Sequence, residues 1–252
     1  MEVTYILLSV LLVSLVSLIG ILPLALKKKT NTHLLVALLS LSAGSLLGTV
    51  FLILLPESVS HGYTLGVAIY LFCGFLFMFL LEKFVHHKHA HTKQTGHGHA
   101  YHLAPLNLIG DAIHNFADGI VIAASYLAST SLGIAATIAV ILHEIPQEIA
   151  DYGVLIYSGL SRGRALMLNF LSATSAFLGA ITGILLAGQL SGFNAFIIPF
   201  AAGNFLYIGA SNLVPELHRH CSLKHTLLHT TMIILGITII ALVAVYGPAH
   251  TH

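Results

Sequence analysis

The sequence predicts an all-α membrane protein that crosses the bilayer several times. Of its 252 residues, 57% are hydrophobic and only 8% are charged, whereas soluble domains carry about 25% charged residues. The hydrophobic residues are gathered into runs of about 20, which is the length that a helix needs to cross the hydrocarbon core. Composition and run length together therefore indicate a polytopic helical protein.

The chain divides into eight such runs. They lie at roughly 4–26, 33–55, 65–84, 104–128, 133–159, 164–187, 195–217 and 225–246. The first run does not resemble a cleavable signal peptide, because Glu2 precedes it and the basic residues Lys27 to Lys29 follow it. We therefore expect eight transmembrane helices in a single transmembrane transporter domain over residues 1–252.

The basic residues predict how the chain is oriented. All ten lie in or beside alternate connections between the runs: Lys27, Lys28, Lys29, Lys83, Lys88, Lys93, Arg162, Arg164, Arg219 and Lys224. Because basic loops remain on the cytoplasmic side, these four connections are expected to be cytoplasmic. Both termini then lie outside, and the plasma (inner) membrane is the expected location.

An internal repeat relates the second run to the seventh. The pairs Ala43-Gly44, Pro56-Glu57 and His61 recur as Ala202-Gly203, Pro215-Glu216 and His220, at a constant offset of 159 residues. These two runs are an odd number of spans apart, so they cross the membrane in opposite directions. The pattern predicts an inverted repeat of helices 1–3 and 6–8 around helices 4 and 5, a 3+2+3 arrangement common among secondary transporters.

Polar side chains that a membrane helix does not ordinarily hold occur in the fourth and fifth runs. His114 and Asp118 share one face of the fourth run. In the fifth, His143, Gln147 and Asp151 share a face, and Glu144 and Glu148 lie beside it. One acid at mid-bilayer costs about 2.5–3.5 kcal/mol on insertion scales, so this grouping indicates a compensating cation. Imidazole and carboxylate ligands suit Zn²⁺ and similar divalent metals. The alternative is a hydrogen-bonded helix pair that holds partly protonated acids.

The connection at about 85–102 is rich in histidine. It contains His86, His87, His89, His91, His97, His99 and His102, together with Gly, Thr and Lys. This composition is typical of a mobile segment that collects metal, here on the cytoplasmic side. The alternative is a solvated linker that binds no metal.

These motifs resemble the ZIP (Zrt/Irt-like) family of divalent metal transporters. The resemblance rests on His114-Asn115-Phe116-x-Asp118-Gly119, on His143-Glu144-x-Pro146-Gln147-Glu148, on the Pro-Glu motifs at 56 and 215, and on the histidine-rich loop. It implies a binuclear metal centre at mid-membrane. The primary ligands would be His114, Asp118, His143 and Gln147, and the second site would be formed by Asn115 and Glu144, with Asp118 bridging. The resemblance also implies a homodimer.

Position 147 departs from the family pattern, because the branch with the His-Glu-x-Pro-His-Glu motif has histidine there. An amide oxygen is a harder, neutral ligand, so we expect weaker Zn²⁺ binding and less discrimination against Fe²⁺, Mn²⁺ or Cd²⁺. Pro146 and Gly119, which lie next to predicted ligands in the sequence, are expected to affect the backbone around the site. Pro146 should free a backbone carbonyl beside the ligands, and Gly119 should allow a second helix to approach closely.

Further acids are candidates for a metal pathway or for supporting the ligands. Asp111 lies one turn before His114, and Asp151 lies two turns beyond His143, with Glu148 preceding it in the same run. These three acids are expected to lead from the centre towards the cytoplasm. Glu57 and Glu216, matched by the repeat, should lie at opposite membrane faces. A Pro-Glu pair is also an ordinary helix terminus.

The function predicted from the sequence is transport of a divalent cation, Zn²⁺ first, towards the cytoplasm, with the metal as substrate and the lipid bilayer as surroundings. Export is an alternative. A zinc protease is another, since His143-Glu144-x-x-Gln147 approaches HExxH, but the second histidine is missing. A metal sensor would be expected to carry a soluble output domain. The chain has no GxxxxGK[ST] phosphate loop and a net charge of +1, so neither a nucleotide nor a nucleic acid is an expected partner.

Overall fold

The computed structural model describes residues 2–26, 32–60, 62–92, 103–189, 192–218 and 223–246. Within these residues the chain is helical and contains no β-strand, which confirms the all-α prediction. The helices are α1 (Glu2–Leu26), α2 (Thr32–Thr49), α3 (Leu55–Ser58), α4 (Leu65–Thr92), α5 (Leu103–Ala128), α6 (Thr130–Tyr157), α7 (Arg162–Ala173), α8 (Ser175–Gln189), α9 (Phe193–Tyr207), α10 (Val214–Leu217) and α11 (Leu223–Tyr246), with π-helical segments η1 (Val50–Leu54) and η3 (Ile208–Leu213).

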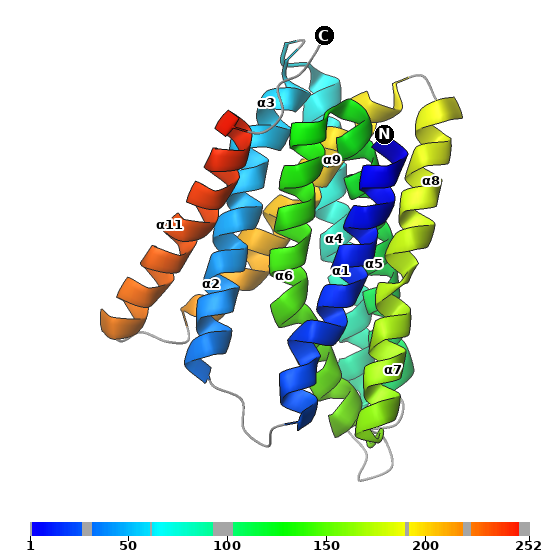
Figure 1. Ribbon diagram of the computed structural model, residues 1–252, viewed down its shortest axis with the longest axis vertical. Coiled ribbons are helices and arrows are strands. Elements are labelled where there is room, and N and C mark those ends of the chain that lie inside the picture. Colours follow the sequence, from blue (N-terminus) through cyan, green and yellow to red (C-terminus); the bar gives the residue numbers. More distant parts are fainter. Residues whose placement is uncertain are drawn as a thin grey trace.

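The long helices form a bundle in which α1 begins and α11 ends at the same end (Figure 1). Arg162 and Arg164 lie at the opposite end, where α6 passes into α7; we call this the basic end. In the described residues, six helical stretches are long and apolar enough to cross a membrane: Val36–Ser58, Leu65–Lys83, Thr130–Ile156, Arg162–Ala187, Phe193–Ser211 and His225–Tyr246. A polytopic membrane protein is thereby confirmed, while the eight-span 3+2+3 topology remains a prediction.

The predicted histidine-rich loop begins later than the sequence indicated. Helix α4 runs to Thr92, so the expected loop at 85–102 starts as helix. His86, His87, His89 and His91 occupy its last turns, with side chains outside the described part of the structure, and His97 and His99 lie outside the described residues. Lysine and histidine do not prevent helix formation, so the apolar run ends before the helix does.

The repeat-related helices share a local irregularity. Residues Val50–Leu54 and Ile208–Leu213 are π-helical, and the two segments end at positions 159 residues apart. In each case a proline, Pro56 or Pro215, lies two residues after the end of the π-helical segment. A proline has no N–H and its ring clashes with the carbonyl four residues earlier, which accounts for a wider turn just before it.

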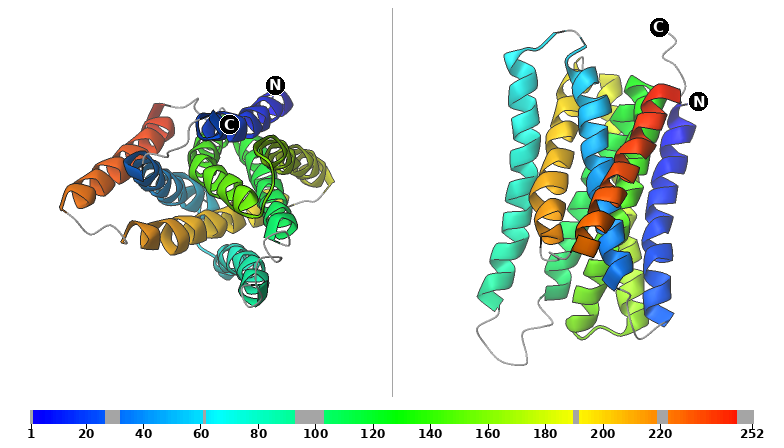
Figure 2. Two further views of the ribbon diagram at one scale, coloured as in Figure 1. Left: turned by 90° about the horizontal axis from the view of Figure 1, so that it is seen from below. Right: turned by 90° about the vertical axis from the view of Figure 1, so that its left-hand side faces the viewer.

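The repeat-related helices also have equivalent neighbours. A Cβ added to Gly44 on α2 would lie 2.2 Å from the Ile233 carbonyl oxygen of α11. At Gly203 on α9, 159 residues later, it would lie 1.8 Å from the Leu71 carbonyl oxygen of α4. Figure 2 shows α11 beside α2 and α4 beside α9, and α2 and α9 run in opposite directions. These paired close approaches are those expected of the predicted repeat.

Two apolar clusters bound the middle of the bundle. The larger includes Val121 and Ile122 of α5, Ala139 of α6 and Phe205 of α9. The smaller, towards the basic end, consists of Ala104, Tyr152, Leu155 and Ala165. The polar residues of α5 and α6 at 111–118 and 143–148 lie between the two clusters along these helices. The fold therefore places them in the interior, with apolar packing on both sides along the bundle.

Candidate metal centre

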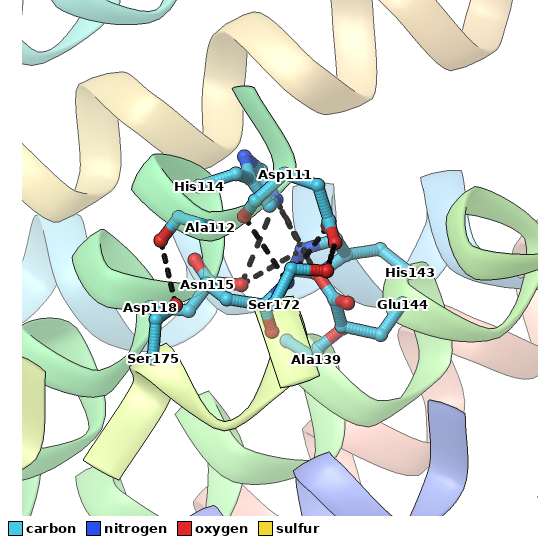
Figure 3. Close-up of polar contacts among 10 residues, drawn as sticks. All are labelled: Asp111, Ala112, His114, Asn115, Asp118, Ala139, His143, Glu144, Ser172 and Ser175. Atoms are coloured by element: carbon cyan, nitrogen blue, oxygen red, sulfur yellow. Dashed lines mark hydrogen bonds and ion pairs between the residues drawn. The ribbon is translucent and has the colours of Figure 1, made fainter. Parts of the chain in front are cut away.

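Four ligand-type side chains converge where α5 packs against α6 (Figure 3). His114 and Asp118 come from α5, one turn apart, and His143 and Glu144 come from α6. His114 is 6% exposed and the other three are at most 1% exposed. The structure thus brings together residues that the sequence placed on two separate helices.

Five of the six separations between the four ligand atoms match those of a tetrahedral metal site. The Nε2 atoms of the two histidines lie 3.2 Å apart. His143 Nε2 lies 3.1 Å from Asp118 Oδ2, and His114 Nε2 lies 3.7 Å from it. Glu144 Oε1 lies 3.4 Å and 3.5 Å from His114 Nε2 and His143 Nε2. Ligands about 2.1 Å from a tetrahedral Zn²⁺ are separated by about 3.4 Å, so the observed distances fit.

A backbone contact fixes the tautomer of His143. Its Nδ1 lies 3.0 Å from the Ala139 carbonyl oxygen, and a carbonyl can only accept, so Nδ1 is the donor. In the neutral ring Nε2 then carries a lone pair and no proton. The lone pair faces the other three groups, and this is the arrangement that orients metal-binding histidines in proteins.

The two carboxylates receive no compensating hydrogen bonds. Both oxygens of Asp118 and both of Glu144 are buried without a hydrogen-bond partner. With a neutral His143, the acceptor atoms of Asp118 and His143 face each other at 3.1 Å. Buried acceptors without a donor are strongly unfavourable, so the cluster needs a positive charge, from a bound metal ion or from a protonated histidine beside the two carboxylates.

The carbonyl that Pro146 leaves without an intrahelical donor, that of Leu142, accepts a hydrogen bond from another helix. Pro146 lies inside α6 and cannot donate to the Leu142 carbonyl oxygen one turn earlier. The hydroxyl of Ser42 on α2 lies within hydrogen-bond reach of that oxygen and of the Leu38 carbonyl oxygen in its own helix, so its single proton is shared between the two. The predicted free carbonyl is therefore confirmed, and its role here is to join α2 to the part of α6 that carries His143.

Small residues set how closely α5 and α8 approach beside the centre. A Cβ on Gly119 would lie 2.0 Å from the Ala176 carbonyl oxygen, and one on Gly179 would lie 1.9 Å from the Phe116 carbonyl oxygen. The predicted close approach at Gly119 is confirmed, with α8 as the partner. The ring of Phe205 on α9 also packs edge-on against His143, with centroids 5.9 Å apart.

Other predicted ligands lie around this cluster. The Asn115 amide donates to Asp111 Oδ1 at 2.9 Å, while its own oxygen is buried without a hydrogen-bond partner. Gln147 is half-buried on α6, and its role as a ligand stays a prediction. Glu144 was expected in a second site with Asn115 and the bridging Asp118. It lies beside both histidines, and its role in a second site stays a prediction.

A second group of acids adjoins the first. Ligand oxygens of Asp111, Glu144 and Glu148 all lie within 4.8 Å of one another. On α7, Ser172 donates to Asp111, and Asn169 donates to Glu148. Sequence reasoning missed both α7 residues, although an asparagine inside an apolar run was a signal that could have identified Asn169.

The remaining candidates lie further from the cluster. Asp151 is half-buried on α6 and is close enough to Asp111 for their charges to interact. Glu57 lies half-buried on α3, at the end of the bundle opposite the basic end. Glu216 lies on α10, and its side chain is outside the described part of the structure. Their participation in a metal pathway stays a prediction.

Comparison of the sequence with protein-family models identifies the family of this chain. The family model described as ZIP Zinc transporter matches residues 3–105 and 100–244. The chain belongs to the ZIP zinc transporter family. This confirms the resemblance deduced from the motifs on α5 and α6.

Curated relatives agree with this assignment. Zinc transporter ZIP13 of Pongo abelii is 32% identical over 83% of this chain and 66% of its own length. Zinc transporter zipt-7.1 of Caenorhabditis briggsae is 29% identical over 85% of this chain and 72% of its length. Zinc transporter zipt-7.2 of Caenorhabditis elegans is 36% identical over 57% of this chain, but the match spans only 32% of that relative. All three are named transporters, in agreement with the expectation of a non-enzymatic function.

Proposed function

We propose that this ZIP family member transports divalent cations across a membrane, with Zn²⁺ as the primary substrate, through the centre on α5 and α6. One observation carries the proposal: four buried ligand-type side chains converge with ligand atoms 3.1–3.7 Å apart in five of their six pairs, and the carboxylate oxygens have no hydrogen-bond partner. Two imidazoles and two carboxylates form a ligand set that Zn²⁺ favours. Membership in a family described as zinc transporters supports it.

The charge pattern and the order of groups along the helices support a path between the centre and the cytoplasm, and import along this path is the direction that we propose. Asp111, Glu148 and Asp151 lie on the side of the centre that faces the basic end. If the basic connections are cytoplasmic, these acids lead the cation from the centre towards the cytoplasm. Both termini are then outside, and the plasma membrane and a homodimer remain expectations.

The repeat supplies a route to alternating access. Helix pairs α2–α11 and α9–α4 make equivalent close approaches in opposite orientations. Inverted repeats can exchange conformations and so open a central site to one side and then the other. A centre of acids and histidines would move through the apolar interior at lower cost once the cation neutralises it.

Zinc flux into sealed proteoliposomes with an enclosed fluorescent indicator tests the function. We expect His114→Ala, Asp118→Ala and His143→Ala to remove most of the flux. Thr238→Ala is a matched control, because its hydroxyl donates to the Ile234 carbonyl oxygen of its own helix, α11, and its loss should leave flux unchanged. Wild-type flux in all three site variants would defeat the assignment. Flux that occurs only in the outward direction from oriented vesicles would favour the exporter.

A further inference from the structure

The second acid group lies next to the centre, displaced towards the basic end. Asp111 precedes His114 by one turn on α5, and Glu148 follows Glu144 by one turn on α6. Because α5 starts and α6 ends at the basic end, both displacements point the same way. Asp111 is 5% exposed, Glu144 1% and Glu148 fully buried. The group therefore occupies the bundle interior.

Helix α7 holds two of these carboxylates in place from the side. Ser172 donates to Asp111 Oδ2, and Asn169 donates to Glu148 Oε2. Figure 3 shows Ser172 pointing at Asp111 and Glu144 lying nearby. The donors are neutral and each satisfies one oxygen. Oε1 of Glu148 and both oxygens of Glu144 are left buried without a hydrogen-bond partner.

Such a group is unfavourable unless its carboxyls are protonated or a cation binds between them. Three carboxylate oxygens within 4.8 Å of one another repel when ionised, and burial strengthens that repulsion. The unpartnered oxygens of Glu144 and Glu148 provide the free acceptors that a cation would use. An oxygen-only ligand set suits harder ions such as Mn²⁺, Mg²⁺ and Ca²⁺, whereas the neighbouring histidines suit Zn²⁺.

We infer that Asp111, Glu144 and Glu148 form a second, oxygen-only divalent cation site, positioned by Asn169 and Ser172 and linked to the histidine centre by Glu144. It differs from the second site implied by the family resemblance, which uses Asn115, Asp118 and Glu144. Since Glu144 belongs to both groups, a cation passes between them by exchanging the other ligands while it keeps one. The inference rests on the proposed function, because the histidine centre delivers the cation.

Mn²⁺ binding to the full chain in lipid nanodiscs tests the site. Electron paramagnetic resonance of unbound Mn²⁺ gives the stoichiometry, and the coupling of bound Mn²⁺ to ¹⁴N shows whether imidazole is a ligand. We expect the wild type to bind one Mn²⁺ with imidazole coupling and one without. In the variant that combines Asp111→Asn and Glu148→Gln, the bound Mn²⁺ without ¹⁴N coupling should disappear, while the Mn²⁺ with imidazole coupling should remain. Glu82→Gln is the matched control, since Glu82 accepts a bond from the Tyr207 hydroxyl that an amide oxygen can also accept.

Two further variants make the outcome decisive. His114→Ala combined with His143→Ala should lose the imidazole coupling and retain the other equivalent. Ser172→Ala keeps every carboxylate but removes a donor to Asp111, so it should weaken the uncoupled site about tenfold; it serves if the double acid variant does not fold.

The results separate the two proposals. Loss of the imidazole-coupled equivalent in the acid variant, or an unchanged stoichiometry, would overturn the oxygen-only site. A wild type that transports zinc but binds only one Mn²⁺, with imidazole coupling, would refute this inference and leave the proposed function intact. A wild type that binds no cation and carries no flux would refute the proposed function as well.

Discussion

Gly119 offers a direct test of how the fold holds the centre, because it lies next to Asp118 at the crossing of α5 and α8. An alanine Cβ at this position would lie 2.0 Å from the Ala176 carbonyl oxygen and 2.8 Å from the Ala180 nitrogen. Both neighbours are backbone atoms, so no side chain can rotate away. Since real Cβ contacts are not shorter than 3.0 Å, α8 must move away by about 1 Å.

We expect Gly119→Ala to lower the free energy of unfolding by about 1–3 kcal/mol, the usual cost of overpacking. The displacement should also disturb Asp118, whose Oδ2 lies only 3.1 Å from His143 Nε2. Zinc affinity should fall together with stability. Thermal unfolding in detergent, followed by size-exclusion chromatography, measures stability, and equilibrium dialysis with Zn²⁺ measures affinity.

Gly153→Ala is the matched control. Gly153 lies on α6, and a Cβ there would have no heavy atom within 4 Å apart from its chain neighbours and its own helix backbone. Alanine is favoured over glycine inside a helix by about 0.5–1 kcal/mol, so this variant should be neutral or slightly more stable. Equal unfolding temperatures and equal zinc affinities for Gly119→Ala and the wild type would refute the packing argument.

Four other predictions address the ligands, their support, the histidine-rich segment and access. Gln147→His should raise Zn²⁺ affinity and weaken competition by Fe²⁺, Mn²⁺ and Cd²⁺ in flux assays; unchanged competition would show that position 147 does not set selectivity. Ser42→Ala leaves the Leu142 carbonyl without its donor and should lower the free energy of unfolding by about 1–3 kcal/mol, whereas an unchanged unfolding temperature would contradict the role of that bond. Deletion of 86–99 should alter apparent affinity but preserve flux, and complete loss of flux in the correctly inserted deletion would speak against a tuning role. In a background without Cys73 and Cys221, a cysteine near His114 should label from one side at a time and change sides with metal; equal, metal-independent labelling from both sides would indicate a channel.

Much of the fold followed from local properties of the chain. The length of the apolar runs was sufficient to place the helices, because a helix must satisfy its backbone hydrogen bonds within the membrane. The 159-residue offset also anticipated equivalent packing, and Gly44 and Gly203 do contact different helices in matching ways. Spacing within each helix was sufficient to put His114 beside Asp118. The apolar runs did not show where α4 would end. The composition becomes polar at the membrane surface, but lysine and histidine still permit a helix, so α4 continues to Thr92.

The sequence by itself determined which residues were candidate ligands; their grouping was decided by tertiary structure. Periodicity gives the face of a helix but not the depth at which two helices meet, so it could not show that Glu144 would join His114 and His143. Nor could it show that α7, distant in sequence from Asp111, would supply Ser172 as its donor. The crossing of α5, α6 and α7 fixes those contacts, because ligand geometry depends on the separation and rotation of whole helices.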